Sequence, residues 1–439
     1  MSRFESLSRR WGGAVCALGA LALLSPLAAM AKSNTPVGFG YQVTGGGNNA
    51  TVYEVSTAEQ LEKALCDPNK LSTDKRVCKD TTPKIIKITG IIDYNAPELR
   101  QMKTEGGCYY SDEKVCTAKG VPAAKWDRLV ATTASYNGHC EGHTGVSVTY
   151  NLLGLKPLAV GSNTTLMGVG KNSGIKGRGL IIRSAKNVIV RNLSITDINE
   201  RVVFAGDGIS IEDSDGVWID QNRFTRIGRQ WLATHLGKTT HITISNNDFD
   251  GTSDTGQNCD GDHYYGLLLD GANESITMIG NWFHNFRGRT PKIFPPKADG
   301  ALPIVHLVNN YFQSGSWHAL DAHQPARVLV EGNYFDNVDT PIIKRAKASD
   351  TGYLFAPLVT VKEQCQGLLG RVCTANVIKG ANPKPSTLPV NEACTFDMTV
   401  LDIMKKTVAA SAGGDVKPYP AKNVPRRVMA EAGPQDWVR

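Results

Sequence analysis

The chain has 439 residues and a formal net charge of +7 at pH 7, and 41% of its residues are hydrophobic. This length allows a large core, and the mild positive charge fits an acidic polymer as partner without selecting one. No basic run is interleaved with aromatic residues, so we do not expect a nucleic-acid partner. No stretch beyond residue 31 is apolar enough for a transmembrane helix, so no membrane partner is expected either.

Residues 1–31 have the pattern of a secretory signal peptide. Three arginines precede an apolar run from Gly12 to Leu27, and Ala29 and Ala31 supply the small residues before a cleavage point. The run is too short to span a bilayer. We therefore expect a secreted, extracellular protein that passes a periplasm if its host has one. Sec export is favoured over the twin-arginine route that Arg9-Arg10 would allow.

The next elements mix strands, one helix and a long excursion. Residues 38–55 predict a Gly-rich turn and a strand, and Ser56-Thr57-Ala58-Glu59 resembles a capping box that begins a helix ending near Leu65. Lys84–Ile88 predicts another strand. Residues 100–150 contain three cysteines, many charges and little periodicity, which predicts a long excursion closed by disulfides.

Nine of the ten cysteines follow the signal segment, and in an exported protein they predict disulfides rather than a metal site. Two close pairs predict short stapled loops: Cys108/Cys116 and Cys365/Cys373. Cys140 or Cys78 is expected to connect to Cys259. The odd count leaves one thiol free, and we assign it to Cys394.

A repeated unit dominates the middle of the chain. It has the form apolar-x-apolar-x-x-Asn-x-Phe, and its starts are 23 to 34 residues apart. The regular copies are Val217–Phe224, Ile242–Phe249, Ile276–Phe283, Val305–Phe312 and Val328–Phe335, preceded by looser copies at Leu166 and Val188. A fixed unit at this period predicts a solenoid. Stacking would place each Asn at a left-handed turn and in a buried ladder of amides, with the Phe rings stacked beside it.

Alternating β-branched residues in short strands predict an all-β, right-handed parallel β-helix. A leucine-rich horseshoe would need a Leu repeat, and a propeller would need Trp-Asp signatures. We expect residues 32–439 to form a single monomeric domain. Its repeat should end near Val361, and residues 362–439 should pack outside it as a tail with a helix near Thr399–Val408.

Three polar segments are the candidates for chemistry. They are Gly206–Ser210, Arg226–Trp231 and Arg287–Lys292. Segments at equal phase in a solenoid lie side by side, so residues 60 positions apart can share one groove.

At these residues the chain resembles the first polysaccharide-lyase family, in particular its pectin lyase branch. Four stretches carry the resemblance: GSNTTLMGVGKNSGIKGRGLIIR, VWIDQNRFTRIGRQ, CDGDHYYGLLLDGANESITMIGNWFHNFRGRTPK and HALDAHQPARVLVEGNYFDNV. The resemblance implies β-elimination on α-1,4-linked galacturonan. The family's GRxPK motif makes Arg289 the base that removes the C5 proton, with Lys292 holding the uronyl group. By the same resemblance, Arg229 neutralises the carboxyl oxygens and Asp207 orients Arg229.

Electrostatics agrees with these implied roles. Proton loss next to an acyl group moves negative charge onto its oxygens, and fixed cations there stabilise the transition state. An arginine base is unusual because guanidinium titrates above about 12. Arg289 in a supporting role, and Asp207–Arg229 as a structural ion pair, are the alternatives.

The metal prediction rests on one comparison within the family. Pectate lyases carry acidic calcium ligands just after the coil that here reads WIDQ. No Asp or Glu occurs between Asp220 and Asp248, so we expect no metal, no cofactor and a methyl-esterified substrate. The cluster Asp254, Asp260 and Asp262 lacks EF-hand spacing and is expected to be solvated.

Aromatic residues predict a sugar-binding surface beside the basic residues. The candidates are Tyr264, Tyr265, Trp231 and Phe204, and ordinary packing is the alternative for each. Gln221, Asp262 and Asp321 depart from the family's WIDH, GHHYW and HAFE-type segments. The competing functions are a calcium-dependent pectate lyase, a non-catalytic polysaccharide-binding β-helix, and a glycoside hydrolase. The last needs paired carboxylates in one groove.

Overall fold

The structure, a computed structural model, describes residues 35–130, 139–235, 237–297, 300–343, 350–358, 366, 369–380 and 416–436. The predicted signal peptide therefore lies outside the described residues. Residues from Thr35 to Arg439 cluster as one compact unit. Within the described residues, no helix is both long and apolar enough to cross a membrane.

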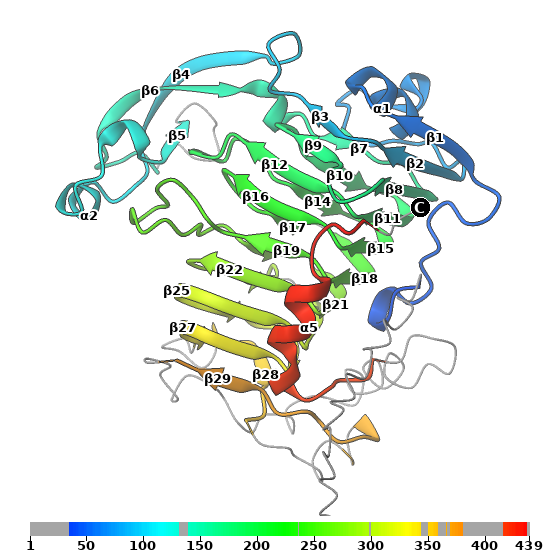
Figure 1. Ribbon diagram of the computed structural model, residues 1–439, viewed down its shortest axis with the longest axis vertical. Coiled ribbons are helices and arrows are strands. Elements are labelled where there is room, and N and C mark those ends of the chain that lie inside the picture. The colour runs from blue at the N-terminus through cyan, green and yellow to red at the C-terminus, as the bar shows by residue number, and fades with distance from the viewer. Residues whose placement is uncertain are drawn as a thin grey trace, which may run out of the picture. The chain divides into compact units, whose positions relative to one another are not determined.

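Most strands belong to three sheets whose neighbours run parallel, and the chain visits the sheets in turn (Figure 1). The first sheet contains β1 (Thr51–Val55), β2 (Lys84–Ile88), β8 (Thr164–Gly168), β11 (Lys186–Arg191), β15 (Asp215–Asp220), β18 (Lys238–Ser245), β21 (Asn273–Ile279), β24 (Ile304–Val308), β26 (Arg327–Glu331) and β28 (Tyr353–Phe355). The second contains β3 (Ile91–Asp93), β9 (Gly174–Lys176), β12 (Ser194–Ile198), β16 (Arg223–Ile227), β19 (Asp248–Asp250), β22 (Trp282–Phe286), β25 (Tyr311–Ala322), β27 (Tyr334–Ile342) and β29 (Val377–Lys379). The third, called here the groove sheet, contains β7 (Leu158–Ala159), β10 (Leu180–Arg183), β14 (Ile209–Glu212), β17 (Leu232–His235), β20 (Leu267–Leu269), β23 (Lys292–Ile293) and the end of β25.

This arrangement confirms the predicted parallel β-helix. Each repeat copy spans one strand of the first sheet and the start of one strand of the second. Their apolar residues fill one continuous core between the three sheets.

The predicted asparagine ladder is present. Asn222, Asn247, Asn281 and Asn310 each donate from Nδ2 to the Oδ1 of the next, at 2.9–3.1 Å. The ladder continues through Asn333 to Asn376, so the repeat runs one coil beyond the predicted end near Val361. The phenylalanines stack as predicted, with Phe249 and Phe283 centroids 4.7 Å apart and nearly parallel.

The left-handed backbone conformation is one residue earlier than predicted. Gln221, Asn246 and Asn309 have φ of 51–55°, and Gly280 and Gly332 occupy the same place in their coils. The side-chain amide and the backbone N–H of each ladder residue both form hydrogen bonds along the stack. The preceding residue therefore makes the turn, and Gly or Asn is favourable at that position.

The excursion over residues 100–150 is more ordered than its irregular sequence suggests. β4 (Met102–Tyr109) pairs antiparallel with β6 (Gly145–Asn151) and with β5 (Arg128–Val130), which also pairs with β13 (Val202–Val203). A short helix, α2 (Glu113–Ala118), follows β4. Two short 3₁₀ turns, Ala123–Lys125 and Leu152–Leu155, complete the segment.

The disulfide pattern corrects two predictions. The observed pairs are Cys66–Cys78, Cys108–Cys140 and Cys116–Cys259. Cys108 lies on β4 and bonds Cys140, whereas Cys116 lies on α2 and bonds Cys259. The short distance between Cys108 and Cys116 in sequence therefore does not reflect a disulfide. Cys116, rather than Cys140 or Cys78, connects the excursion to Cys259. Cys373 is disulfide-bonded, while Cys365 and Cys394 lie outside the described residues.

The one predicted early helix is present with a shifted cap. In α1 (Ala58–Leu65), Thr57 Oγ1 accepts from the backbone N–H of Gln60, and Gln60 Oε1 accepts from that of Ser56. The capping residue is therefore Thr57 rather than Ser56. Two further 3₁₀ turns, Gly38–Gly40 and Pro68–Lys70, flank this region.

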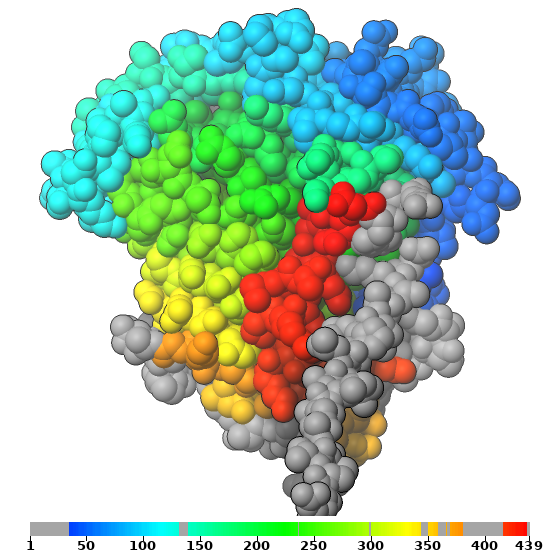
Figure 2. Space-filling model, in the orientation of Figure 1, coloured from blue at the N-terminus to red at the C-terminus, as the bar shows by residue number. Residues whose placement is uncertain are grey.

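The C-terminal segment packs against the outside of the coils. After the turn Ala421–Asn423, helix α5 (Val424–Glu431) places Val424 and Val428 on Tyr311 of β25. Figure 2 shows this segment lying across several coils on one face. The helix predicted near Thr399–Val408 lies outside the described residues.

Candidate active site

One edge of the groove sheet brings the predicted polar segments into a single row. Backbone hydrogen bonds join the turns that lead into successive strands, from Gly208 to Gln230, Trp231 to Gly266, and Leu267 to Arg289. Asp207, Gln230, Tyr265 and Arg289 therefore occupy equivalent places in neighbouring coils. The close approach requires glycine at 266, where a Cβ would lie 2.3 Å from the carbonyl oxygen of Arg289.

Arg229 is held by a buried carboxylate. Its Nη1 lies 2.7 Å from Asp207 Oδ2, while Asp207 Oδ1 accepts from the backbone N–H of Gln230 at 3.0 Å. Burial raises the pKa of Asp207, but the charge of Arg229 and the contacts with His235 and Gln230 outweigh it, so the pKa ends below its usual value. Asp207 is thus anionic at neutral pH and fixes the direction of Arg229.

His235 adds a second cation to this pair. Its Nδ1 lies 2.9 Å from Asp270 Oδ1, and its Nε2 lies 4.0 Å from Asp207 Oδ2. Burial lowers the pKa of His235, but the two carboxylates more than compensate and raise it to about 9. The ring is therefore protonated at neutral pH, a state the sequence did not suggest.

Arg289 has surroundings of a different kind. Its Cζ lies 5.1 Å from the centroid of Tyr264 and 4.8 Å from that of Tyr265. With the Gln230 side-chain amide in the orientation that satisfies both of its hydrogen bonds, Arg289 Nη1 donates to Gln230 Oε1 at 2.8 Å and Gln230 Nε2 donates to Gly266 O at 3.3 Å. Among the described residues no carboxylate lies within ion-pair distance of Arg289, whereas Arg229 and Arg287 each contact one.

The backbone at Arg289 has an unusual conformation. Its φ is 57°, in the left-handed region, and the Thr290–Pro291 peptide bond that follows is cis. A non-glycine residue in that region is held there by its surroundings, at a cost of order 1–3 kcal/mol. The backbone N–H of Arg289 donates to Nε2 of the buried His318 at 3.3 Å.

Lys292 lies on β23, opposite Asp321 in register. Its Nζ is 4.0 Å from Asp321 Oδ2 and 4.7 Å from the ring centroid of Phe294. Asp321 also lies 3.2 Å from His323 Nε2. The groove sheet and the turns that lead into its strands thus carry all four residues predicted for chemistry: Asp207, Arg229, Arg289 and Lys292.

The predicted aromatic surface needs correction at two positions. The side chain of Trp231 is 0% exposed and stacks on Phe249 in the core, so it cannot contact a sugar on the surface. Tyr265 is 3% exposed; its hydroxyl donates to that of Tyr110 at 2.5 Å, and its ring supports Arg289. Trp231 directly precedes β17 and belongs to the core cluster, which the clustering of aromatic residues in sequence could not reveal.

Tyr264 and Phe204 remain partly exposed. Phe204 lies beneath the guanidinium of Arg229, with Cζ 5.4 Å from its centroid. Tyr264 stacks against Trp317, with centroids 5.9 Å apart and planes 19° from parallel. Trp317 is 44% exposed, and Phe294 on the far side of Lys292 is 46% exposed. Neither exposed ring was predicted from the sequence.

His263 is a further residue of the site that the sequence did not single out. Its Nε2–H donates to the carbonyl oxygens of Arg229 and Tyr265, at 2.8 and 3.0 Å. Burial lowers its pKa to about 4, so the ring is neutral and acts as a fixed donor. His263 is therefore a positioning residue that joins the segments carrying Arg229 and Tyr265. In the sequence, the role of His263 was indicated only by its place in the GDHYY segment, which is part of a stretch that resembles the family.

The expectation of no metal is not tested by these contacts. Across the described ranges, no group of three or more His, Cys, Asp or Glu side chains is arranged to hold an ion. Asp207, the acidic residue nearest to Arg229, is already engaged by that guanidinium.

Comparison with known proteins identifies the family. Residues 117–353 match the family model described as pectate lyase. The chain is 35% identical over 402 residues to a probable pectin lyase E of Aspergillus fumigatus, covering 91% of this chain and 94% of that protein. It is 34% identical over 416 residues to a probable pectin lyase F of Neosartorya fischeri, covering 94% and 98%.

Solved structures support the fold. A pectate lyase from Bacillus sp. N165, in complex with trigalacturonate, aligns with a TM-score of 0.52 at 19% identity, covering 91% of this chain and 98% of that one. A pectate lyase from Paenibacillus sp. 0602 aligns with a TM-score of 0.55 at 15% identity, covering 92% and 97%. With the sequence matches to curated relatives over nine tenths of its length, the chain belongs to the pectate lyase family.

Proposed function

We propose that the protein is a secreted lyase that cleaves methyl-esterified α-1,4-linked galacturonan by β-elimination. The observation that carries this proposal is Arg289, which lies at the edge of the groove sheet beside the Asp207–Arg229 pair and has no carboxylate partner among the described residues. The curated relatives named as probable pectin lyases support the same substrate class.

The proposed reaction uses these residues in distinct roles. Arg289, in its neutral guanidine form, takes the proton from C5 and becomes a guanidinium, and the electron pair of that C–H bond forms the C4–C5 double bond. The C4–O bond breaks, its electron pair stays with the leaving oxygen, and that oxygen takes up a proton. Arg229 and Lys292 stabilise the negative charge that develops on the acyl oxygen, as fixed donors aimed at a developing anion do.

The charge pattern of the groove favours an ester over a free carboxylate. Arg229 is engaged by Asp207, His235 by Asp270, and Lys292 lies near Asp321. These three cations are matched by carboxylates of the protein, and Arg289 in its neutral form adds no charge. Little positive charge therefore remains to neutralise a run of uronate groups. A methyl-esterified segment brings no such charge, and its C5 proton is more acidic.

The proposed reaction is tested by tracing oxygen. Methylated pectin is digested in water enriched in oxygen-18, and the products are examined by mass spectrometry and ultraviolet absorbance. Elimination gives an absorbing unsaturated uronide with no heavy oxygen at the cleaved bond. Hydrolysis would insert one heavy oxygen and give no absorbance, and that outcome would overturn the proposal.

A further inference from the structure

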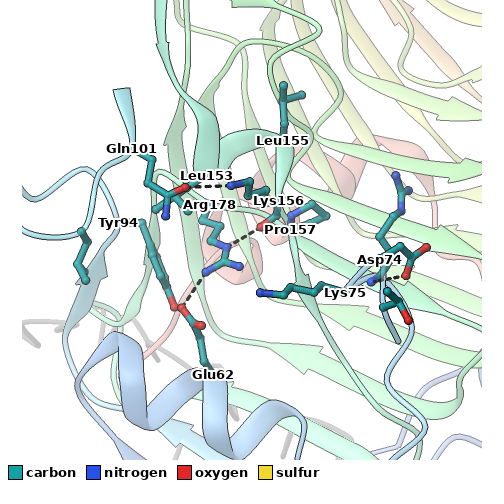
Figure 3. Close-up of a pocket in the computed structure, with 13 residues that line it drawn as sticks. Glu62, Asp74, Lys75, Tyr94, Gln101, Leu153, Leu155, Lys156, Pro157 and Arg178 are labelled. Atoms are coloured by element: carbon teal, nitrogen blue, oxygen red, sulfur yellow. Dashed lines mark hydrogen bonds and ion pairs between the residues drawn. The ribbon is translucent and has the colours of Figure 1, made fainter. Parts of the chain in front are cut away.

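A cavity of about 530 Å³ lies at the start of the groove sheet, away from Arg289. Figure 3 shows that Glu62 of α1, the 72–76 loop, Tyr94, and the segment from Leu153 to Pro157 surround it, with Arg178 in its wall. Its volume lies in the range of small-ligand sites. The mechanism above uses none of these residues.

This cavity continues the row that forms the candidate active site. Arg178 and Asp207 occupy equivalent places in successive coils, in Gly177-Arg178-Gly179 and Gly206-Asp207-Gly208. The backbone N–H of Leu180 donates to Gly208 O at 2.9 Å, and a Cβ at Gly179 would lie 2.0 Å from Asp207 O. Neighbouring strands are about 4.8 Å apart, so the cavity begins one coil from Asp207.

The outward face of the groove sheet joins the two regions as well. Arg76, which lines the cavity, lies 2.6 Å from Glu212 on β14. Glu212 pairs in register with His235 on β17. A polysaccharide lying along the coils past Arg229 would therefore reach the cavity.

The loop that closes the cavity is rigidly built. The Cys66–Cys78 disulfide closes its base, and at its tip the backbone N–H groups of Lys75 and Ser72 donate to Ser72 O and Val77 O. Lys75 has a φ of 57°, in the left-handed region. This turn directs the Lys75 side chain toward the cavity (Figure 3).

The charges here differ from those around Arg229. Arg178 is paired with Glu62 at 2.8 Å, and its Nε donates to Lys156 O at 2.6 Å. Lys156 Nζ donates to the neutral amide oxygen of Gln101, at 3.0 Å. Among the described residues, neither Lys75 nor Lys156 has a carboxylate within ion-pair distance. The cavity therefore presents two cations that the protein does not neutralise.

We propose that this cavity is a distal binding site for an unesterified galacturonate residue of the same polysaccharide chain, whose carboxylate is bound by Lys75 and Lys156. The protein would then cut esterified bonds at a fixed distance from a free carboxylate. This inference rests on the proposed function, because it needs a pectin chain lying along the groove sheet. Two exposed lysines and one carboxylate form charge-assisted contacts that weaken with salt.

The test compares the full-length protein with the double variant Lys75→Met/Lys156→Met and the control Lys79→Met. Lys79 is an exposed lysine directly after the disulfide-closed loop, and it does not line the cavity. The substrates are fully methylated pectin and pectin with randomly placed free carboxylates. The double variant should lower the ratio of kcat/KM for the second substrate to that for the first by about fivefold, the size expected for two exposed ion pairs. The control should keep the wild-type ratio.

A second readout locates the carboxylate in the product. Mass spectrometry of the wild-type products should show free carboxylates concentrated at one distance from the new unsaturated end, and the double variant should lose this preference. A random distribution in the wild type, or an unchanged ratio in the double variant, would overturn the distal site. No product from fully methylated pectin would instead overturn the proposed function, so the two failures are distinguishable.

Discussion

The guanidinium of Arg289 donates a hydrogen bond to the side-chain amide of Gln230 at 2.8 Å. The backbone N–H of Gln230 donates in turn to Asp207, which holds Arg229. Gln230 is fully buried, so this one residue sets the position of the proposed base relative to the cation that faces the acyl group. The two arginines are 60 positions apart in sequence but share one support.

Changing Gln230 tests that support. Gln230→Met keeps the volume and removes the hydrogen bond, so we expect kcat to fall about tenfold with little change in KM, because orientation is lost. Gln230→Glu should be worse, because a carboxylate would stabilise the protonated form of Arg289, which cannot accept a proton. Steady-state kinetics on methylated pectin measures both. Equal activity of the two variants would contradict the requirement that Arg289 be able to lose its proton.

Removing the proposed base should abolish turnover without unfolding the protein. Arg289→Ala and Arg289→Lys should both lack measurable activity, because lysine cannot reproduce the guanidinium placed over Tyr264 and Tyr265. Arg229→Ala should lose about 100-fold in kcat, the usual effect of one oxyanion donor. Arg426→Ala, on the exposed face of α5, is the matched control. Near-normal turnover by Arg289→Ala would remove Arg289 from the reaction.

Two tryptophans should separate stability from binding. Trp231→Ala removes a fully buried ring and should cost about 3–5 kcal/mol of unfolding free energy. Trp317→Ala removes an exposed ring stacked on Tyr264 and should raise KM several-fold with Tm unchanged. Urea denaturation and kinetics on both variants check the distinction. A KM effect confined to Trp231 would restore it as a sugar-binding residue.

His235 should make stability depend on pH. Its pKa is about 9 in the folded protein, against an ordinary value of 6.5. The protonated ring therefore contributes stability that is complete below pH 6.5 and is lost as the pH rises through about 9. His235→Gln should flatten this part of the curve of unfolding free energy against pH. An unchanged slope in the variant would assign the effect to other groups.

The repeat could be predicted because its signals are local and periodic. Each copy has an Asn and a Phe at fixed places, as Asn281 and Phe283 are in one of them. Stacking the copies therefore leaves little freedom in where these side chains lie. The left-handed residue before each Asn was missed because several residue types occupy it, from Gln221 to Gly280. The last coil was missed because only Asn376 remains of its motif.

The candidate site was predictable only in part. Motifs indicated Asp207, Arg229, Arg289 and Lys292, but not which neighbouring rings point outward. Trp231 adjoins Arg229 in sequence and is buried, whereas Trp317 is distant in sequence and exposed beside Tyr264. Disulfide partners such as Cys116 and Cys259 depend on how the excursion folds back, which no local pattern records.

The measurement that tests the central claim most directly is formation of unsaturated uronide from two substrates. Highly methylated pectin and polygalacturonate are each incubated with the protein, once with calcium and once with a chelator. The proposed function predicts product from methylated pectin at the same rate in both conditions and little from polygalacturonate. Product mainly from polygalacturonate, lost with the chelator, would contradict the ester preference. That result would favour the calcium-dependent pectate lyase alternative.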